Sequence, residues 1–249
     1  MLELQHLSVA YRGAPPVLND LSLTLTPGIT VLIGHNGAGK STLLHAALGE
    51  VAYTGNILLN GTSLVTYAPR ERAKLLSLLP QKLPAPALCV REVVALGFAP
   101  FCTRPGEKEW QTVREILEKL EIESLSARPV QTLSGGERQK VFLALLLAQN
   151  TPVLLLDEPA TYLDATFSAT LYRVLREERE KGKHILLVMH DLAAALDLAD
   201  RVLLLEGGKL TFDGTPQACL NVRIPERVFG LTRYRATDEN QNEVYFFKA

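Results

Sequence analysis

Apolar and polar residues alternate along much of the N-terminal part of the chain, which is typical of half-buried β-strands. Residues 1–11 (MLELQHLSVAY) and 21–25 (LSLTL) alternate in this way. Residues 55–61 (GNILLNG) form a shorter apolar run between turn-forming residues. Residues 29–34 (ITVLIG) are apolar without interruption up to a glycine, which predicts a strand covered on both faces. We therefore expect a β-rich region with one buried central strand.

The pattern becomes helical between residues 81 and 149. Prolines at residues 80, 84 and 86 first break the chain into a loop. Apolar residues then recur at helical spacing, with charged residues on the opposite face. These apolar residues are Trp110, Val113, Ile116, Leu117 and Leu120. We expect a helical insert over residues 82–150.

Strand-like apolar runs return in the last third of the chain. They cover residues 153–157 (VLLLD), 184–189 (HILLVM) and 201–208 (RVLLLEGG), and helical patterns lie between them. Such alternation predicts an α/β fold with a mostly parallel sheet, in which ligands bind at the carboxyl ends of the strands. Residues after about 216 carry mixed signals and favour no single element.

Composition excludes several classes of function. The chain has 249 residues, is 47% hydrophobic and carries a net charge of -1, so it can bury a sizeable core and has no overall attraction to nucleic acid. Its 3 cysteines are far apart and have no metal-ligand spacing, which favours reduced thiols. The N-terminus reads as a strand rather than a signal peptide. Apolar runs such as residues 141–148 are far shorter than the roughly 20 residues of a membrane span.

Residues 34–42 (GHNGAGKST) place three glycines, a lysine and two hydroxyls between the covered strand and a helical pattern. They fit the phosphate-binding motif G-x-x-x-x-G-K-[ST]. Glycines let successive N–H groups point inward, and the helix N-terminus adds partial positive charge. We expect a nucleoside triphosphate here, with Lys40 on the β- and γ-phosphates, Ser41 on Mg²⁺ and Thr42 on another phosphate oxygen. The expected binding residues are Gly34, His35, Asn36, Gly37, Ala38, Gly39, Lys40, Ser41 and Thr42.

Two carboxylates stand at the end of the strand at residues 153–157. Asp157 is suited to hold Mg²⁺ through water or Ser41, and Glu158 is suited to polarise an attacking water. The alternative is that Glu158 only caps a local turn. An acid directly after the Mg²⁺-binding acid favours hydrolysis over binding alone.

A second candidate phosphate site precedes the apolar run at residues 141–148. Ser134 and Glu137 have the spacing of a capping box, so this segment could be no more than a capped helix. Gly135 and Gly136, however, are poor helix formers that expose the N-terminal amides. The spacing leaves open which phosphate is bound, and on which molecule.

Three further residues say little when each is taken alone. His190 ends a strand, where histidines are more often structural. Gln81 precedes the proline-rich loop. Tyr11 follows the first strand and could stack on a base, or could be an ordinary surface tyrosine.

Taken in order, these segments resemble the nucleotide-binding subunit of ATP-binding cassette (ABC) transporters. The resemblance runs from about residue 2 to 216 and includes LSGGE at residues 133–137 and TYLD at residues 161–164. It implies a P-loop NTPase fold, with a RecA-like core, an antiparallel β subdomain and an inserted helical subdomain. Residues 1–249 would form one nucleotide-binding domain. Its RecA-like and β lobe would span residues 1–81 and 151–215, the helical subdomain 82–150, and a short tail 216–249.

The resemblance also implies roles for the candidate residues. Two copies would pair head to tail with ATP between them, and Ser134, Gly135, Gly136 and Glu137 of one copy would cover the γ-phosphate held by the other. Lys40, Glu158 and His190 would be catalytic, with Glu158 the general base and His190 the γ-phosphate switch. Mg²⁺ would be held by Ser41, Gln81 and Asp157. Asp164 would lie at the dimer seam, and Tyr11 would stack on adenine.

Residues 90–100 (VREVVALGFAP) indicate the branch of the ABC family. They are similar to a sequence segment found in importers for ferric siderophores, haem and cobalamin. This implies an ATPase on the cytoplasmic face of the membrane, with two transmembrane permease subunits and, indirectly, a periplasmic or lipoprotein substrate-binding protein. No nucleic acid partner is expected. Ala160 and residues 165–168 (ATFS) depart from the usual pattern of that branch. The alternatives are a soluble ABC ATPase of a cytosolic assembly, an importer ATPase for free metal ions, and a regulator without hydrolysis.

Overall fold

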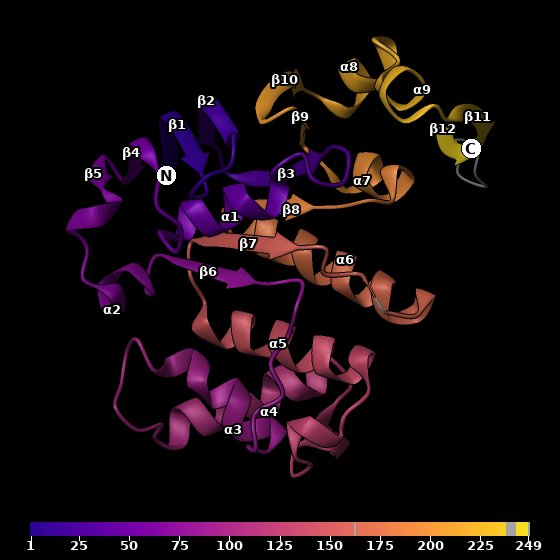
Figure 1. The fold of residues 1–249 in the computed structure, drawn as a ribbon. Helices are drawn as coiled ribbons and strands as arrows, with labels where there is room; N and C mark the ends of the chain where they lie inside the picture. The colour runs from indigo at the N-terminus through magenta and orange to yellow at the C-terminus, as the bar shows by residue number, and fades with distance from the viewer. Residues whose placement is uncertain (162, 238–242, 249) are drawn as a thin grey trace.

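The computed structural model describes residues 1–161, 163–237 and 243–248. The described chain combines helices with a six-stranded, a four-stranded and a two-stranded sheet. The α/β class predicted from the alternating pattern is confirmed. The overlapping layers are visible in Figure 1.

A largely parallel six-stranded sheet runs through the centre of the molecule, in the order β10-β9-β3-β8-β7-β6. Five strands are parallel, and only β10 at one edge is antiparallel to its neighbour. The parallel strands are β3 (Gly28–Ile33), β6 (Leu76–Leu79), β7 (Val153–Asp157), β8 (His184–Val188) and β9 (Arg201–Glu206), and β10 is Lys209–Gly214. Every residue of β3 is buried, as its uninterrupted apolar run predicts.

An antiparallel four-stranded sheet covers one face of the central sheet, in the order β2-β1-β4-β5. Its strands are β1 (Leu2–Ala10), β2 (Pro16–Leu25), β4 (Thr54–Leu59) and β5 (Thr62–Ser63). One apolar cluster joins this sheet, helix α1 (Lys40–Leu48) and alternate residues of the parallel strands, such as Leu32 and Leu155. The amino end of α1 is thereby fixed at the carboxyl end of β3.

Helices cover the opposite face of the central sheet (Figure 1). The segment between residues 90 and 149 contains α3 (Val90–Ala95), α4 (Glu107–Lys119) and α5 (Gly135–Gln149), together with short 3₁₀ turns at Leu96–Phe98, Glu123–Leu125 and Val130–Thr132. In α4 the expected apolar face is the one that packs, since Val113 and Leu117 are buried. A 3₁₀ turn at Leu64–Thr66 and α2 (Pro69–Arg72) lead into β6.

The remaining helices flank the sheet and support the C-terminal segment. Helix α6 (Ala165–Glu180) connects β7 to β8, and α7 (Leu192–Leu198) connects β8 to β9. The mixed pattern after residue 216 becomes α8 (Pro216–Asn221), α9 (Ile224–Phe229) and a hairpin of β11 (Thr232–Thr237) and β12 (Glu243–Lys248). Strand β12 packs against α7, so this segment folds back onto the body of the molecule.

Among the described residues, no helix combines the length and the apolar character that crossing a lipid bilayer requires.

Candidate functional site

The loop at residues 34–39 connects buried β3 to α1 through a backbone that only glycines adopt easily. Gly34, Gly37 and Gly39 all have positive φ angles, of 154°, 79° and 103°. A Cβ atom on Gly34 would lie 2.3 Å from the carbonyl oxygen of Leu205, and one on Gly39 would lie 2.8 Å from Leu18 Cδ2. Gly34 and Gly39 thus allow both the positive φ angles and the close packing that place the loop at the amino end of α1.

Lys40 is the first residue of α1 and is buried, with 6% of its surface exposed. Its Nζ donates hydrogen bonds to the carbonyl oxygens of Gly34 at 2.8 Å and His35 at 3.0 Å. Burial lowers the pKa of this ammonium, and the nearby carboxylates of Glu158 and Asp157 act in the opposite direction. The loop therefore wraps around its own cation and holds it beside the residues that precede α1.

Asp157 ends β7 and is also buried, with 3% of its surface exposed. Burial raises the pKa of its carboxyl group, and interactions with Ser41 partly lower it again. The Oδ1 atom of Asp157 is buried and has no hydrogen-bond partner among the described residues. A buried, unsatisfied carboxylate oxygen beside a hydroxyl is a donor set that suits a hard divalent cation.

Glu158 is the centre of a polar cluster at the carboxyl edge of the parallel sheet. Gln81, which follows β6, donates from Nε2 to Glu158 Oε2 at 2.7 Å. His190, which follows β8, contacts the other carboxylate oxygen through Nε2. Glu158 itself has a positive φ of 51°, which is uncommon for a residue with a side chain. Three strand ends thus converge on one carboxylate.

These groups line one open cleft of about 470 Å³. The loop residues Asn36, Gly37 and Gly39 form one side, and Gln81, Glu158 and His190 form another. The remaining lining residues are Val17, Lys40, Ser41 and Thr42. The structure therefore brings the phosphate-loop motif and Glu158 together with two residues, Gln81 and His190, that say little when each is taken alone.

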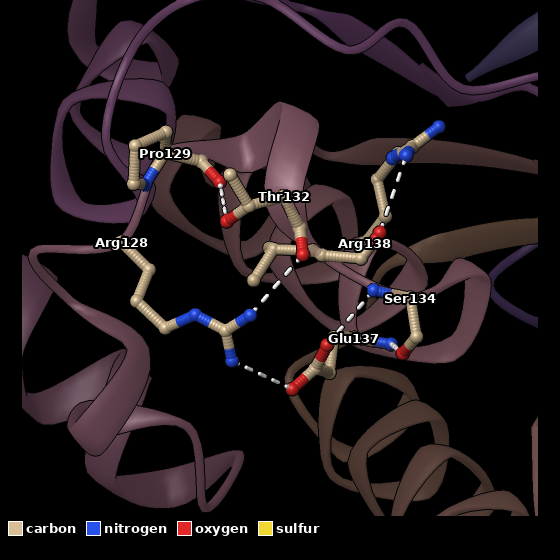
Figure 2. Close-up of polar contacts among 7 residues, drawn as sticks. Arg128, Pro129, Thr132, Ser134, Glu137 and Arg138 are labelled. Atoms are coloured by element: carbon tan, nitrogen blue, oxygen red, sulfur yellow. Dashed lines mark hydrogen bonds and ion pairs between the residues drawn. The ribbon is translucent and has the colours of Figure 1, made fainter.

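The LSGGE segment forms the capped start of α5 (Figure 2). Ser134 Oγ accepts from the Glu137 amide at 3.2 Å, and the Glu137 carboxylate accepts from the Ser134 amide at 2.8 Å, which confirms the predicted capping box. Hydrogen bonds from Ser134 lower the pKa of Glu137, and Arg128 donates to the same carboxylate at 3.2 Å. Gly135 and Gly136 form the first turn of α5, and none of these residues lines the cleft beside Lys40.

Two other candidates lie outside the cleft in the described part of the chain. Tyr11 is 49% exposed just after β1 and is not among the cleft residues. Asp164 caps α6 by accepting from the Phe167 amide at 2.7 Å. Tyr162, within the TYLD segment, lies outside the described residues.

Sequence reasoning missed two contributors to this region. Val17 of β2 lines the cleft, and its ordinary β-strand pattern carries no signal of that position. Val228 and Phe229 of α9 contact His35, although 193 residues separate His35 from Val228. The mixed apolar pattern of the C-terminal segment gives no indication of this contact.

Comparison with known proteins identifies the family. A family model described as ABC transporter matches residues 18–161. The chain belongs to the ABC transporter family. It is an ATP-binding, ATP-hydrolysing member of that family, as the phosphate loop and the two carboxylates at the end of β7 predict.

Relatives within the ABC family match nearly the whole chain. A hemin import ATP-binding protein HmuV of Pseudomonas fluorescens (strain Pf0-1) is 41% identical, with 93% of each chain covered. An iron(3+)-hydroxamate import ATP-binding protein FhuC of Bacillus subtilis (strain 168) is 34% identical over 97% of this chain and 92% of that protein. A solved ATP-binding subunit of an ABC transporter matches with a TM-score of 0.80 at 27% identity, covering 92% of this chain and 93% of that one. The family predicted from the motifs is confirmed.

Proposed function

We propose that this ABC ATPase is the subunit that powers uptake of a metal chelate, such as haem or a ferric siderophore, through separate membrane subunits. The observation that carries the proposal is the convergence of the phosphate loop, Gln81, Glu158 and His190 on one cleft. The buried carboxylate of Asp157 lies beside Ser41, which lines that cleft. Import of a chelate is supported by relatives whose names are hemin and iron(3+)-hydroxamate import ATP-binding proteins. The soluble ATPase and the free-metal importer are not favoured, because these relatives are named for the import of hemin and of an iron(3+)-hydroxamate.

Mg²⁺ fits the polar groups beside Lys40. The unsatisfied Asp157 Oδ1 and the adjacent Ser41 hydroxyl supply oxygen ligands, and the Gln81 side chain lies in the same cleft. Ser41, Asp157 and Gln81 would hold the ion, which supplies charge neutralisation on the phosphate oxygens when bound.

The residues of the cleft have different roles in ATP hydrolysis. Loop amides and Lys40 bind the phosphates and orient the terminal one. Glu158 takes a proton from the attacking water, and its carboxylate is held in place from both sides by Gln81 and His190. His190 lines the same cleft and would also contact the γ-phosphate. Tyr11, at the end of β1, would stack on the adenine.

The domain organisation and the partners belong to the same proposal. The chain would be one nucleotide-binding domain with a helical subdomain over residues 82–150 and a tail over residues 216–249. Two copies would pair head to tail, so that Ser134, Gly135, Gly136 and Glu137 of one complete the site of the other and Asp164 lies at the seam. The dimer would sit on two permease subunits at the cytoplasmic face, supplied by a substrate-binding protein.

Replacing the proposed general base tests the hydrolytic assignment. Glu158→Gln keeps the shape of the side chain and removes the proton acceptor, so ATP turnover should fall by at least about 100-fold. Binding of ATP, measured by equilibrium dialysis, should persist. Glu118→Gln, on the exposed face of α4, is the matched control and should hydrolyse ATP like the wild type. Turnover near the wild-type rate in Glu158→Gln would remove Glu158 as the base.

Capture from the native membrane tests the transport assignment. The tagged Glu158→Gln chain should co-purify from detergent-solubilised membranes with a multi-span permease. Recovery of soluble partners alone, with the chain absent from the membrane fraction, would contradict the importer proposal.

A further inference from the structure

The C-terminal segment reaches the phosphate loop through one side chain. Nε2 of His35 donates a hydrogen bond to the carbonyl oxygen of Val228, at 2.9 Å. The His35 ring also packs on Phe229, with 5.2 Å between ring centroids and a tilt of 44°. Both contacts come from α9, so the second residue of the loop is attached to a distant part of the chain.

The same residue is attached to the cation of the loop. The carbonyl oxygen of His35 accepts a hydrogen bond from Lys40 Nζ at 3.0 Å. The next residue, Asn36, lines the phosphate cleft. The His35 side chain is therefore hydrogen-bonded to α9, while its backbone is hydrogen-bonded to Lys40. His35 thus links α9 directly to the cation of the phosphate loop.

A second hollow lies beside the phosphate cleft, and Phe229 of α9 forms part of its wall. It measures about 380 Å³ and is lined by Gly34, His35, Asn36, Met189, His190, Leu192 and Phe229. Asn36 and His190 line both this hollow and the phosphate cleft. A shift of Phe229 would therefore act on residues that face the nucleotide.

Helix α9 is held firmly enough to position the loop. Ile224 and Pro225 are buried against the body of the molecule. Glu226 forms an ion pair with Arg233 at 3.3 Å, and the Leu231 amide donates to the Pro225 carbonyl at 3.2 Å. The carbonyl oxygen of Val228 is thus a fixed acceptor rather than part of a free end.

We infer that His35 is a positioning residue that couples α9, within the C-terminal segment, to nucleotide binding at the phosphate loop. The inference rests on the proposed nucleotide site. The contact with Val228 holds the loop in the conformation that encloses Lys40, and the coupling is reciprocal, so nucleotide binding orders α9 in return. The class of ligand that the segment senses is a nucleoside triphosphate.

Three variants separate the hydrogen bond from the ring contact. His35→Phe keeps an aromatic ring against Phe229 and removes the donor. His35→Gln keeps an N–H donor and removes the ring, and Phe229→Ala changes the contact from the α9 side. The His35–Val228 bond is solvent-exposed, so His35→Phe should raise the KM for Mg-ATP by about two- to fivefold with kcat unchanged. His35→Gln should restore part of the affinity.

Hydrogen–deuterium exchange supplies a readout that a purely structural role would not change. Adding Mg-ATP to the full chain should slow amide exchange in residues 224–230 of the wild type, and His35→Phe should lose this protection. Thermal unfolding checks that each variant folds, and if His35→Phe does not, Phe229→Ala and His35→Gln decide the question. Variants with wild-type KM, together with α9 exchange that ignores ATP, would overturn the coupling. A wild type that binds no ATP would instead overturn the proposed function.

Discussion

Glycine is needed at Gly34 and at Gly37 for different physical reasons. Both have positive φ, but a Cβ on Gly34 would meet the Leu205 carbonyl at 2.3 Å, whereas one on Gly37 would have no neighbour within 4 Å. The clash at Gly34 is with backbone of β9, which cannot move without disturbing the central sheet. Gly37 faces only the conformational cost of a left-handed residue.

Alanine substitutions at these two glycines should therefore differ. Gly37→Ala should lower the free energy of unfolding by about 1–2 kcal/mol, the cost of the left-handed conformation. Gly34→Ala should lower it further and abolish ATP binding, because the loop must leave the Leu205 carbonyl. Urea unfolding and equilibrium dialysis with ATP measure the two effects. Equal losses in the two variants would contradict the close approach to β9.

The sequence predicted the candidate residues better than the contacts between them. Spacing alone identified the phosphate loop, and the ends of parallel strands indicated that Asp157 and His190 would share an edge. The bond from Gln81 to Glu158 depends on how the loop after β6 bends, which no local pattern records. The His35–Val228 contact could not be predicted from the sequence, because the acceptor is a backbone carbonyl, which every residue has.

At the scale of elements, continuous apolar runs were the reliable signal. They predicted β3, β7, β8 and β9, which are covered on both faces. The edge strands β6 and β10 were not predicted. Strand β6 has only four residues and includes buried Ser77, which bonds to Thr151 at 2.8 Å, while β10 has polar and half-buried residues in alternation. An edge strand pairs on one side only, and its formation depends strongly on packing against that single neighbour, which its own sequence does not record.

Helix α6 carries a buried ion pair that makes stability depend on pH. Glu178 is buried with 3% of its side chain exposed, and it accepts from Lys183 and Lys181, at 2.6 Å each. Burial alone would raise the pKa of Glu178, but the hydrogen bonds from the two lysines outweigh it, so the pKa lies below its ordinary value. A carboxylate whose pKa is lowered by folding stabilises the folded state fully at pH values above its pKa in the unfolded chain. This stabilisation is lost as the pH falls through the lower pKa of the folded state.

Replacing this carboxylate should destabilise the protein in a pH-dependent way. Glu178→Gln leaves Lys183 buried without its counter-charge and should lower the free energy of unfolding by about 3–5 kcal/mol at pH 7. The difference from the wild type should shrink as pH falls from the ordinary glutamate range through the lowered pKa of folded Glu178, because the wild type then loses the same charge. Glu180→Gln, at the exposed end of α6, is the control. A difference of the same size at pH 7 and at the lowest pH at which both proteins remain folded would contradict a role for the charge.

At the scale of the whole molecule, the two candidate phosphate sites do not meet within one chain. The cleft beside Lys40 is lined from the central sheet and α1, whereas Ser134 starts α5 in the helical layer (Figure 1). Both are glycine-rich helix starts, and the first amides of a helix have no carbonyl partner within it. If each binds the same kind of phosphate, a second copy must bring its α5 to the cleft, which is the head-to-tail pairing that we propose.

Dimerisation of the hydrolysis-deficient chain tests this pairing. With Mg-ATP, Glu158→Gln should shift from monomer to dimer in sedimentation velocity, because trapped ATP bridges the two copies. Adding Ser134→Arg should abolish the dimer by placing bulk against the γ-phosphate. Adding Ser134→Ala removes the same helix cap, at about 1 kcal/mol of stability, but leaves the amides of Gly135 and Gly136 accessible, so a dimer should still form. A dimer that persists with Ser134→Arg would place the contact between copies elsewhere, and a Glu158→Gln chain that stays monomeric with ATP at high concentration would contradict the shared site.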